Sequence, residues 1–199
     1  MNKIEFIYKV YNNVLVMLAD RHYNIPTSIK ISFALFKKKY INNAYNFTLT
    51  HSHDNHKIRV LFNLNNKNKL QNIKQLLHDT YETFSIDTDE VLLILNKKPN
   101  NIINKFIQQS IYKYNVDLFW LSILQINIIK HILQPIFILL SEEEKQLVLS
   151  KYNLKVNQLP KMTIQDPISK YYKYPKYSVI KIIRTSRDSI SSESYRYIG

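Results

Sequence analysis

Glycine is almost absent from this chain, and the one glycine among its 199 residues is the last residue, Gly199. The loops that cradle phosphate groups in P-loop and dinucleotide-binding enzymes need several glycines, so that the backbone can approach the ligand closely. The sequence therefore excludes nucleotide-binding enzymes of those two classes. Asn, Lys, Ile and Tyr are abundant instead, a bias that is typical of an AT-rich genome.

The composition predicts a folded chain of one large domain or two small ones. Hydrophobic residues make up 45% of the chain, which is enough to build a core. There is no cysteine, so disulfides and thiolate metal ligands are excluded. The amino terminus lacks the basic-then-apolar run of a secretory signal, and we therefore expect an intracellular protein.

Two helix starts can be placed in the last third of the chain. Ser141 and Glu144 form a capping box, and the acidic side chains there favour the positive end of a helix, which predicts a helix over residues 141–152. The Asp166-Pro167 pair predicts a short helix over residues 167–172. Asp can accept from the free N–H groups of the first turn, and proline gives up a donor that has no partner there.

Strands complete this carboxy-terminal unit. Residues 177–184 are rich in β-branched side chains and lie between turn-prone stretches, so they predict a strand. Residues 194–198 predict an antiparallel partner for it. Together with the two helices, these strands predict a small α+β domain over residues 126–199 with a mixed or antiparallel sheet.

Residues 1–125 predict a separate α/β domain with a small central sheet flanked by helices, which makes the whole chain α+β. Apolar residues recur at helical spacing over residues 4–18. The other predicted elements are a helix from Thr27 or Ser28 through Lys39, a strand over 58–64, a helix over 69–81, a strand over 91–95, a helix after Pro99 and a strand over 116–121. Strands that alternate with helices in this way predict parallel pairing through right-handed crossovers.

The order of short motifs in the last third of the chain is its most specific feature. It runs KYNLKVNQLPKMTIQDPISKYY, continues as SVIKIIRTS and closes on SYRYIG. This string resembles the assembly domain of the fifth shared subunit of eukaryotic RNA polymerases, a family that includes a small archaeal polymerase protein. The positions that match without a gap are Asn157, Gln158, Leu159, Pro160, Lys161, Asp166, Pro167, Lys181, Ile182, Ile183, Arg184, Ser186, Tyr195 and Arg196.

The first part of the chain resembles the same family in the order of its elements, because eukaryotic members carry an amino-terminal jaw domain with a restriction-endonuclease-like fold. The matching residues are Met17, Asp20, Arg21, Tyr23, Phe119, Asn127, Ile128, His131, Leu133 and Pro135. Four positions depart from the family: Lys173 and Tyr177 replace its usual glycines, His22 stands where glycine is common, and Arg187 stands where an acidic residue is usual. Such departures indicate a fast-evolving lineage, such as an AT-rich protist or a large DNA virus.

The resemblance implies a non-catalytic structural subunit of a multisubunit DNA-dependent RNA polymerase, with no cofactor, no small-molecule substrate, no metal and no catalytic residue of its own. In the family, the carboxy-terminal domain anchors the subunit to the largest polymerase chain among the other subunits. The amino-terminal domain forms part of the lower jaw near downstream double-stranded DNA. The implied location is the nucleus for a cellular enzyme, and a cytoplasmic viral factory or the virion for a viral one.

The resemblance also assigns residues to two roles. Lys97, Lys98, Pro99 and Asn100 align with a loop that approaches DNA, and a lysine pair before a proline-started helix suits phosphate binding without base readout. His131, Pro135 and Tyr152 join the assembly signature given above. The candidates for docking are Tyr152, Leu154, Leu159, Tyr171 and Tyr172, although a private core explains them equally well.

The chain is strongly basic, with a formal charge of +13 that is spread along its length. Residues 1–126 carry 16 basic and 9 acidic side chains, and residues 127–199 carry 12 and 6. Such a charge predicts a polyanionic neighbour, because lysines and arginines that bind phosphates release counterions. A solvated surface explains it as well. A free-standing nucleic-acid-binding protein is therefore one alternative function.

A nuclease is the second alternative, because it needs two carboxylates for Mg²⁺ and a lysine on a strand. The predicted strands contain no Glu-x-Lys or Asp-x-Lys triplet, and Glu143-Glu144-Lys145 lies at a helix start. A membrane span over residues 118–140 is disfavoured by its polar residues, and two buried strands joined by a bend explain that stretch better. His131 is expected to be structural and not a catalytic base.

Three histidines form the only group with metal-like spacing. His51, His53 and His56 surround Asp54 in a polar stretch. A structural zinc site normally closes four ligands on an ordered backbone. The sequence therefore favours an incidental histidine-rich loop over a metal site.

Overall fold

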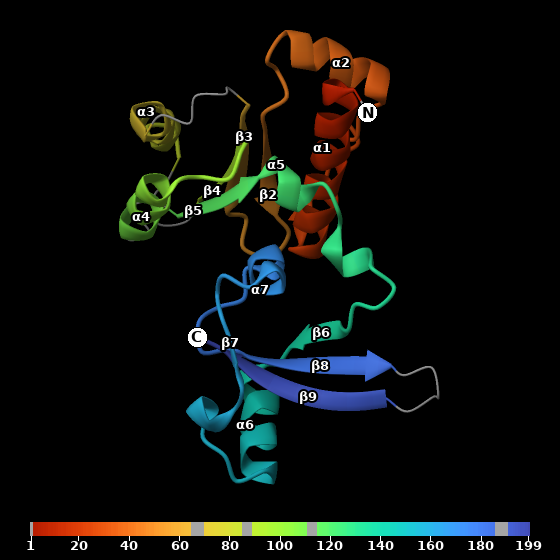
Figure 1. Cartoon of the computed structure of the whole chain (residues 1–199), viewed down its shortest axis with the longest axis vertical. Helices are drawn as coiled ribbons and strands as arrows, with labels where there is room; N and C mark the ends of the chain where they lie inside the picture. The colour runs from red at the N-terminus through yellow and green to blue at the C-terminus, as the bar shows by residue number, and fades with distance from the viewer. Residues whose placement is uncertain (1, 65–69, 85–88, 111–114, 186–190) are drawn as a thin grey trace. The chain divides into compact units, whose positions relative to one another are not determined.

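The computed structural model describes residues 2–64, 70–84, 89–110, 115–185 and 191–199. The chain divides into two compact units, Met1–Ile126 and Asn127–Gly199. Figure 1 shows the elements of both units. Each unit has its own sheet and its own core, as the sequence predicts for an α+β chain.

The first unit is built on a five-stranded mixed sheet in the order β1-β2-β3-β4-β5. Its strands are β1 (Tyr23–Asn24), β2 (Phe47–His51), β3 (Lys57–Asn63), β4 (Glu90–Leu95) and β5 (Val116–Trp120). The predicted parallel pairing is confirmed for β3, β4 and β5. The β1–β2 and β2–β3 pairs are antiparallel.

Helices cover both faces of this sheet (Figure 1). On one face, α3 (Leu70–Tyr81) and α4 (Asn101–Ser110) pack on alternate side chains of β3, β4 and β5. On the other face lies α1 (Lys3–Asp20), whose Tyr11 ring contacts Phe47 and Phe62. The short α2 (Phe33–Ile41) and α5 (Leu121–Leu124) pack against α1. Because both faces are covered, β4 is apolar along almost its whole length.

The second helix begins later than predicted. It starts at Phe33 and not at Thr27 or Ser28. The hydroxyls of Tyr8 and Tyr11 donate to the carbonyls of Ile31 and Ile29, both at 2.9 Å. Those carbonyls belong to the segment that would have formed the first turn of an earlier helix. Side chains of α1, which are distant in sequence, hold that segment outside the helix.

The prediction of two buried strands joined by a bend over residues 118–140 is wrong in part. The stretch contains the end of β5, then α5, the 3₁₀ helix η1 (Ile128–Lys130) and the strand β6 (Ile136–Leu139). Most of β6 is exposed. None of the helices in the described part of the chain is long and apolar enough to cross a membrane.

The second unit contains a four-stranded sheet in the order β6-β8-β9-β7. Its other strands are β7 (Lys161–Met162), β8 (Val179–Thr185) and β9 (Ser191–Ile198). β8 pairs with β9 in antiparallel register, which confirms the predicted partnership. β6 is antiparallel to β8, and β7 is parallel to β9.

Two predicted helices flank this sheet. α6 (Glu142–Lys151) begins at the Ser141–Glu144 capping box, and α7 (Pro167–Tyr172) begins where the side chain of Asp166 accepts from the Ile168 N–H at 2.9 Å. Val179 packs on the α6 side, and Ile180 and Ile182 pack on the α7 side. Neighbouring residues of β8 thus enter two cores, which explains its continuous apolar run.

Three residues that replace glycines of the resembled family have left-handed backbone conformations. His22, Lys173 and Tyr177 have φ angles of 63°, 55° and 66°, in the left-handed region that favours glycine. These are the three positions where the sequence departs from glycine in the resembled family. The turns keep the conformation that glycine would adopt most easily, although the residues have changed.

Candidate assembly surface and DNA-proximal loop

The signature residues of the second unit mainly build its fold. Asn157 and Gln158 lie in η2 (Val156–Gln158), where the Gln158 side chain accepts from the backbone N–H of Lys155 at 2.7 Å. Leu159 is buried against Leu149 and Val179. The carbonyl of Pro160 accepts from the N–H of Tyr197 at 3.1 Å, which leads the chain into β7. The turn therefore joins α6 to β7, the edge strand that pairs with β9.

The charged signature residues lie on the β8–β9 ladder. Lys181 forms an ion pair with Glu193 at 2.6 Å across the two strands. The hydrogen bond between them raises the pKa of Lys181 and lowers the pKa of Glu193. Arg196 lies opposite Ile180, and Arg184 is exposed and lies opposite Ser192. Ser186 lies outside the described residues.

The docking candidates separate into buried and accessible side chains. Leu159 and Tyr171 belong to the core of the second unit, so the private-core explanation describes them better than docking does. Tyr152 is 51% exposed, and its ring lies 6.1 Å from the ring of Tyr195. Among these candidates, Tyr152 is the one most open to a partner. Leu154 and Tyr172 are partly buried.

A set of exposed apolar side chains lies outside the docking candidates that the sequence predicts. We call it the apolar edge, and it consists of Ile132, Leu133, Ile136, Ile138 and Leu139. Ile132 and Leu133 are 94% and 79% exposed. The other three lie on β6, the outermost strand of the sheet. Contiguous exposed apolar side chains of this kind mark interaction surfaces. The apolar run is visible in the sequence, but there it predicts a buried strand.

His131 and Pro135 bracket the first part of the apolar edge. The Nδ1 atom of His131 accepts from the N–H of Leu133 at 3.3 Å, and its carbonyl accepts from the N–H of Gln134 at 2.9 Å. Pro135 immediately precedes β6. These bonds fix a turn that presents Ile132 and Leu133 outward. His131 therefore acts on the backbone of its own segment.

The DNA-proximal loop of the first unit follows β4. Lys97 and Lys98 are exposed, and Pro99 is buried. Asn100 is the residue that caps the next helix, because its side chain accepts from the N–H of Ile103 at 2.9 Å. The prediction of a proline-started helix is therefore wrong by two residues: α4 begins at Asn101. The lysine pair still lies just ahead of a helix amino end.

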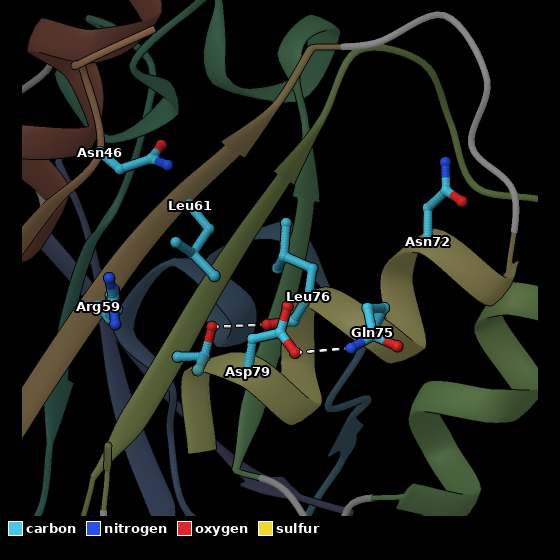
Figure 2. Close-up of a pocket in the computed structure, with 8 residues that line it drawn as sticks. Asn46, Arg59, Leu61, Asn72, Gln75, Leu76 and Asp79 are labelled. Carbon is cyan, nitrogen blue, oxygen red and sulfur yellow. Dashed lines mark hydrogen bonds between the residues drawn. The ribbon is translucent and has the colours of Figure 1, made fainter. Parts of the chain in front are cut away.

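A cavity of about 460 Å³ lies beside β3 and α3 in the first unit (Figure 2). Several of its polar groups bond one another or the backbone. Gln75 donates to Asp79 at 2.8 Å, and the Thr80 hydroxyl donates to the Leu76 carbonyl at 2.7 Å. Asn46, at the cavity wall, accepts from the backbone N–H of Phe62. The lining residues hold the fold and include no nucleophile paired with a base.

The described strands also lack the nuclease arrangement. None of them carries a Glu-x-Lys or Asp-x-Lys triplet, and Glu143-Glu144-Lys145 lies in the first turns of α6. Asp117 of β5, which could be suspected as a metal-binding carboxylate, accepts from Arg21 at 2.7 Å. Arg21 thus ties the end of α1 to β5 as a structural residue.

Comparison with known proteins identifies the family. The family model described as RNA polymerase Rpb5, N-terminal domain, matches residues 2–80, and the model described as RNA polymerase Rpb5, C-terminal domain, matches residues 126–198. This chain belongs to the Rpb5 family. The second match spans nearly all of the second unit, including η2, α7, β8 and β9, and hence every signature position from His131 to Arg196.

Curated relatives agree with this family. The chain is 27% identical over 181 residues to "DNA-directed RNA polymerase V subunit 5A" of Arabidopsis thaliana, covering 88% of this chain and 80% of the relative. It is 26% identical over 198 residues to "DNA-directed RNA polymerases IV and V subunit 5B" of the same plant, covering 96% and 89%. It is 40% identical over 73 residues to "DNA-directed RNA polymerases I, II, and III subunit rpabc1" of Dictyostelium discoideum, covering 37% of each chain.

Neither Rpb5 model extends over residues 81–125. That stretch contains β4, β5, α4 and the loop with Lys97 and Lys98. The alignment with the Arabidopsis thaliana subunit 5B covers 96% of the chain and so includes most of this stretch.

Proposed function

We propose that this Rpb5-type protein is a non-catalytic structural subunit of a multisubunit DNA-directed RNA polymerase, anchored by its second unit to the largest subunit. The main support for this proposal is the apolar edge. It lies in the second unit, nearly all of which matches the Rpb5 C-terminal domain. Nucleotide addition takes place on other chains of the enzyme. For a polymerase of cellular origin, the expected location is the nucleus.

The anchoring role is supported by the form of the apolar edge. Apolar side chains at the centre of an interface contribute most of its binding energy once water is excluded. Ile132 and Leu133 protrude from a turn that His131 stabilises, so they need no rearrangement before they contact a partner. Tyr152 adds an exposed aromatic ring elsewhere in the unit.

For the first unit, we propose that the loop with Lys97 and Lys98 lies near downstream double-stranded DNA. Two exposed lysines precede the amino end of α4, where the free N–H groups and the helix dipole also favour anions. Flexible cations of this kind bind phosphates without reading base sequence. The contribution is therefore expected to be general and sensitive to salt.

Affinity purification tests the proposal most directly. The tagged protein, expressed in its own host and purified at moderate salt, should bring down the two largest polymerase chains in equal amounts. A free-standing nucleic-acid-binding protein would instead retain DNA or RNA and no polymerase chain. Mg²⁺-dependent cleavage of a plasmid by the protein alone would support the nuclease alternative and contradict the proposal.

A further inference from the structure

The hairpin between β2 and β3 brings together three side chains that can ligate a metal ion. The imidazoles of His51 and His56 and the carboxylate of Asp54 each offer one ligand atom, and these atoms all lie within 4.8 Å of one another. His51 ends β2, and His56 immediately precedes β3. The Nδ1 atoms of His51 and His56 lie 3.6 Å and 3.9 Å from the same oxygen of Asp54.

The hairpin is tied down by hydrogen bonds, unlike the incidental loop that the sequence favours. The N–H of His51 donates to the carbonyl of His56 at 2.8 Å and closes the loop. Ser52 donates both its N–H and its hydroxyl to the carbonyl of His22, at 3.0 Å and 2.7 Å. The side chains of His51 and His56 are only 14% and 20% exposed, whereas Asp54 is 73% exposed. The cluster therefore has an ordered inner side and an outer side open to solvent.

The hydrogen bonds around His56 determine which ring nitrogen is available. Its Nε2 atom lies 2.8 Å from the hydroxyl of Tyr23. That hydroxyl is also hydrogen-bonded to Glu90, and burial raises the pKa of Tyr23 far above its usual value. Because the Glu90 carboxylate can only accept, Tyr23 donates to it and accepts from Nε2–H of His56. The neutral ring then carries its lone pair on Nδ1, the atom that faces Asp54.

The Nδ1 atom of His51 also carries a lone pair. It accepts from the backbone N–H groups of His53 and Asp54, both at 3.4 Å. These bonds are longer than usual and are weak competitors for a ligand. The Nδ1 atoms of His51 and His56 thus face one oxygen of the Asp54 carboxylate at 3.6 Å and 3.9 Å.

We propose that His51, Asp54 and His56 bind a divalent transition-metal ion of the zinc type, which staples the β2–β3 hairpin. Two imidazoles and a carboxylate suit Zn²⁺, Co²⁺ or Ni²⁺. A tetrahedral site with bonds of about 2.0–2.2 Å places its ligand atoms roughly 3.3 Å apart. The present separations are longer, at 3.6 Å and 3.9 Å from Asp54 and up to 4.8 Å within the group, so the three side chains have to close around the ion. The ring centroid of His53 lies 5.7 Å from that of His51, so His53 or a solvent water could complete the tetrahedron.

Tyr23 is the positioning residue of this site. Metal-ligating histidines usually donate their second ring N–H to an outer partner that fixes the tautomer, and Tyr23 has that place beside His56. It lies on β1, which pairs with β2, so the ion would reinforce the β1–β2–β3 edge of the sheet. This role is independent of polymerase assembly and of DNA binding.

The test uses the full chain without a purification tag, and CoCl₂ and ZnCl₂ as probes at pH 7.5. One equivalent of Co²⁺ should produce the visible absorption bands of a tetrahedral site, Zn²⁺ should displace it, and saturating Zn²⁺ should raise Tm. His51→Ala should abolish the stoichiometric signal. Asp54→Asn should weaken binding with the fold retained, because the side chain is exposed. Tyr23→Phe should weaken it about ten- to a hundredfold.

The matched control is His78→Ala. His78 and Glu82 form an exposed pair at 3.3 Å, which is as able as any surface pair to bind metal adventitiously. The control should bind Co²⁺ as the wild type does. Absence of a saturable Co²⁺ spectrum in the wild type would overturn the proposal, and so would a spectrum that survives His51→Ala and Asp54→Asn together. Affinity should fall at acidic pH, because protons compete with the metal ion for the imidazoles.

Discussion

The two sheets of this chain differ in how far their apolar strands are buried. In the first unit, β4 lies inside the sheet with helices on both faces, and Val91, Leu93 and Leu95 are fully buried. In the second unit, β6 is equally apolar in sequence but forms the outer edge, and it leaves most of its side chains exposed. A buried strand stabilises its own unit, whereas an exposed one is available to a partner. Under the proposed function, β4 serves folding and β6 serves assembly.

The largest expected effect comes from placing charge on the apolar edge. Ile132→Asp with Leu133→Asp should weaken capture of the largest polymerase subunit at least about a hundredfold, since buried interface anchors contribute about 2 kcal/mol or more each. Both side chains are more than three-quarters exposed, so the unit should still fold. Capture is measured by quantitative pull-down at fixed salt, and folding is checked by circular dichroism.

The control for this variant lies in the first unit. Leu35→Asp with Ile41→Asp adds the same charge to side chains that are 52% and 69% exposed on α2. It should leave capture unchanged. Equal losses in the two double variants would show that added charge, and not the apolar edge, weakens capture. The contrast between the two units would then fail.

Removing the buried ion pair should affect the first unit alone. Arg21→Ala leaves Asp117 without its guanidinium partner, and loss of one member of a buried pair costs about 3–5 kcal/mol. Hydrogen exchange should accelerate across β3, β4 and β5 and remain unchanged across β8 and β9. Arg21→Met combined with Asp117→Leu should recover much of the loss, because the uncompensated charge is gone. Equal acceleration in both sheets would mean that the units do not unfold separately.

A smaller effect is expected at the lysine loop. Lys97→Glu with Lys98→Glu should reduce DNA retention by the assembled polymerase and should lower the slope of log K against log salt by about 1 for each lost phosphate contact. Folding and capture of the largest subunit should not change. The matched variant is Lys37→Glu with Lys38→Glu on α2, which carries the same change of charge on exposed lysines. If both variants reduce retention equally, general charge explains the binding and the loop has no special role.

The smallest effect concerns the left-handed turns of the second unit. Tyr177→Gly and Lys173→Gly should each increase the free energy of unfolding by about 0.5–1 kcal/mol. A non-glycine residue in the left-handed conformation destabilises the folded state by roughly 1–2 kcal/mol. Glycine removes this strain, but its greater conformational freedom in the unfolded chain offsets part of the stabilisation. Denaturant unfolding measures the change. Lys176→Gly, at an exposed neighbour without a left-handed φ angle, should instead destabilise slightly.

Local signals predicted much of the second unit because the interactions that start its elements are short in sequence. The capping box at Ser141 and the Asp166 cap act within three residues, and the structure confirms both. The β8–β9 pairing follows from a β-branched segment and a tyrosine-containing segment that are close in sequence. The start of α2 could not be predicted in the same way, because it depends on Tyr8 and Tyr11, which lie about twenty residues earlier.

The candidate site was harder to predict than the fold. Periodicity identifies β6 as an apolar strand, but it does not say whether the strand lies in the middle of a sheet or at its edge. The histidine cluster is visible as a spacing in the sequence, while the tautomer that the proposed metal site requires depends on Tyr23 and Glu90, which are far away in sequence. The position of β6 in the sheet and the tautomer of the histidines are both determined by residues outside the local motif.

The amino-acid sequence by itself determined the polymerase-subunit family, the division into two α+β units and the helix starts of the second unit, because these follow from contiguous motifs and short-range hydrogen bonds. Tertiary structure alone decided which apolar strand is buried, which turns hold left-handed residues without glycine, and which histidine nitrogens face Asp54. The physical reason is that burial, strand order and tautomer depend on neighbours brought together across many residues, and no local pattern encodes those neighbours.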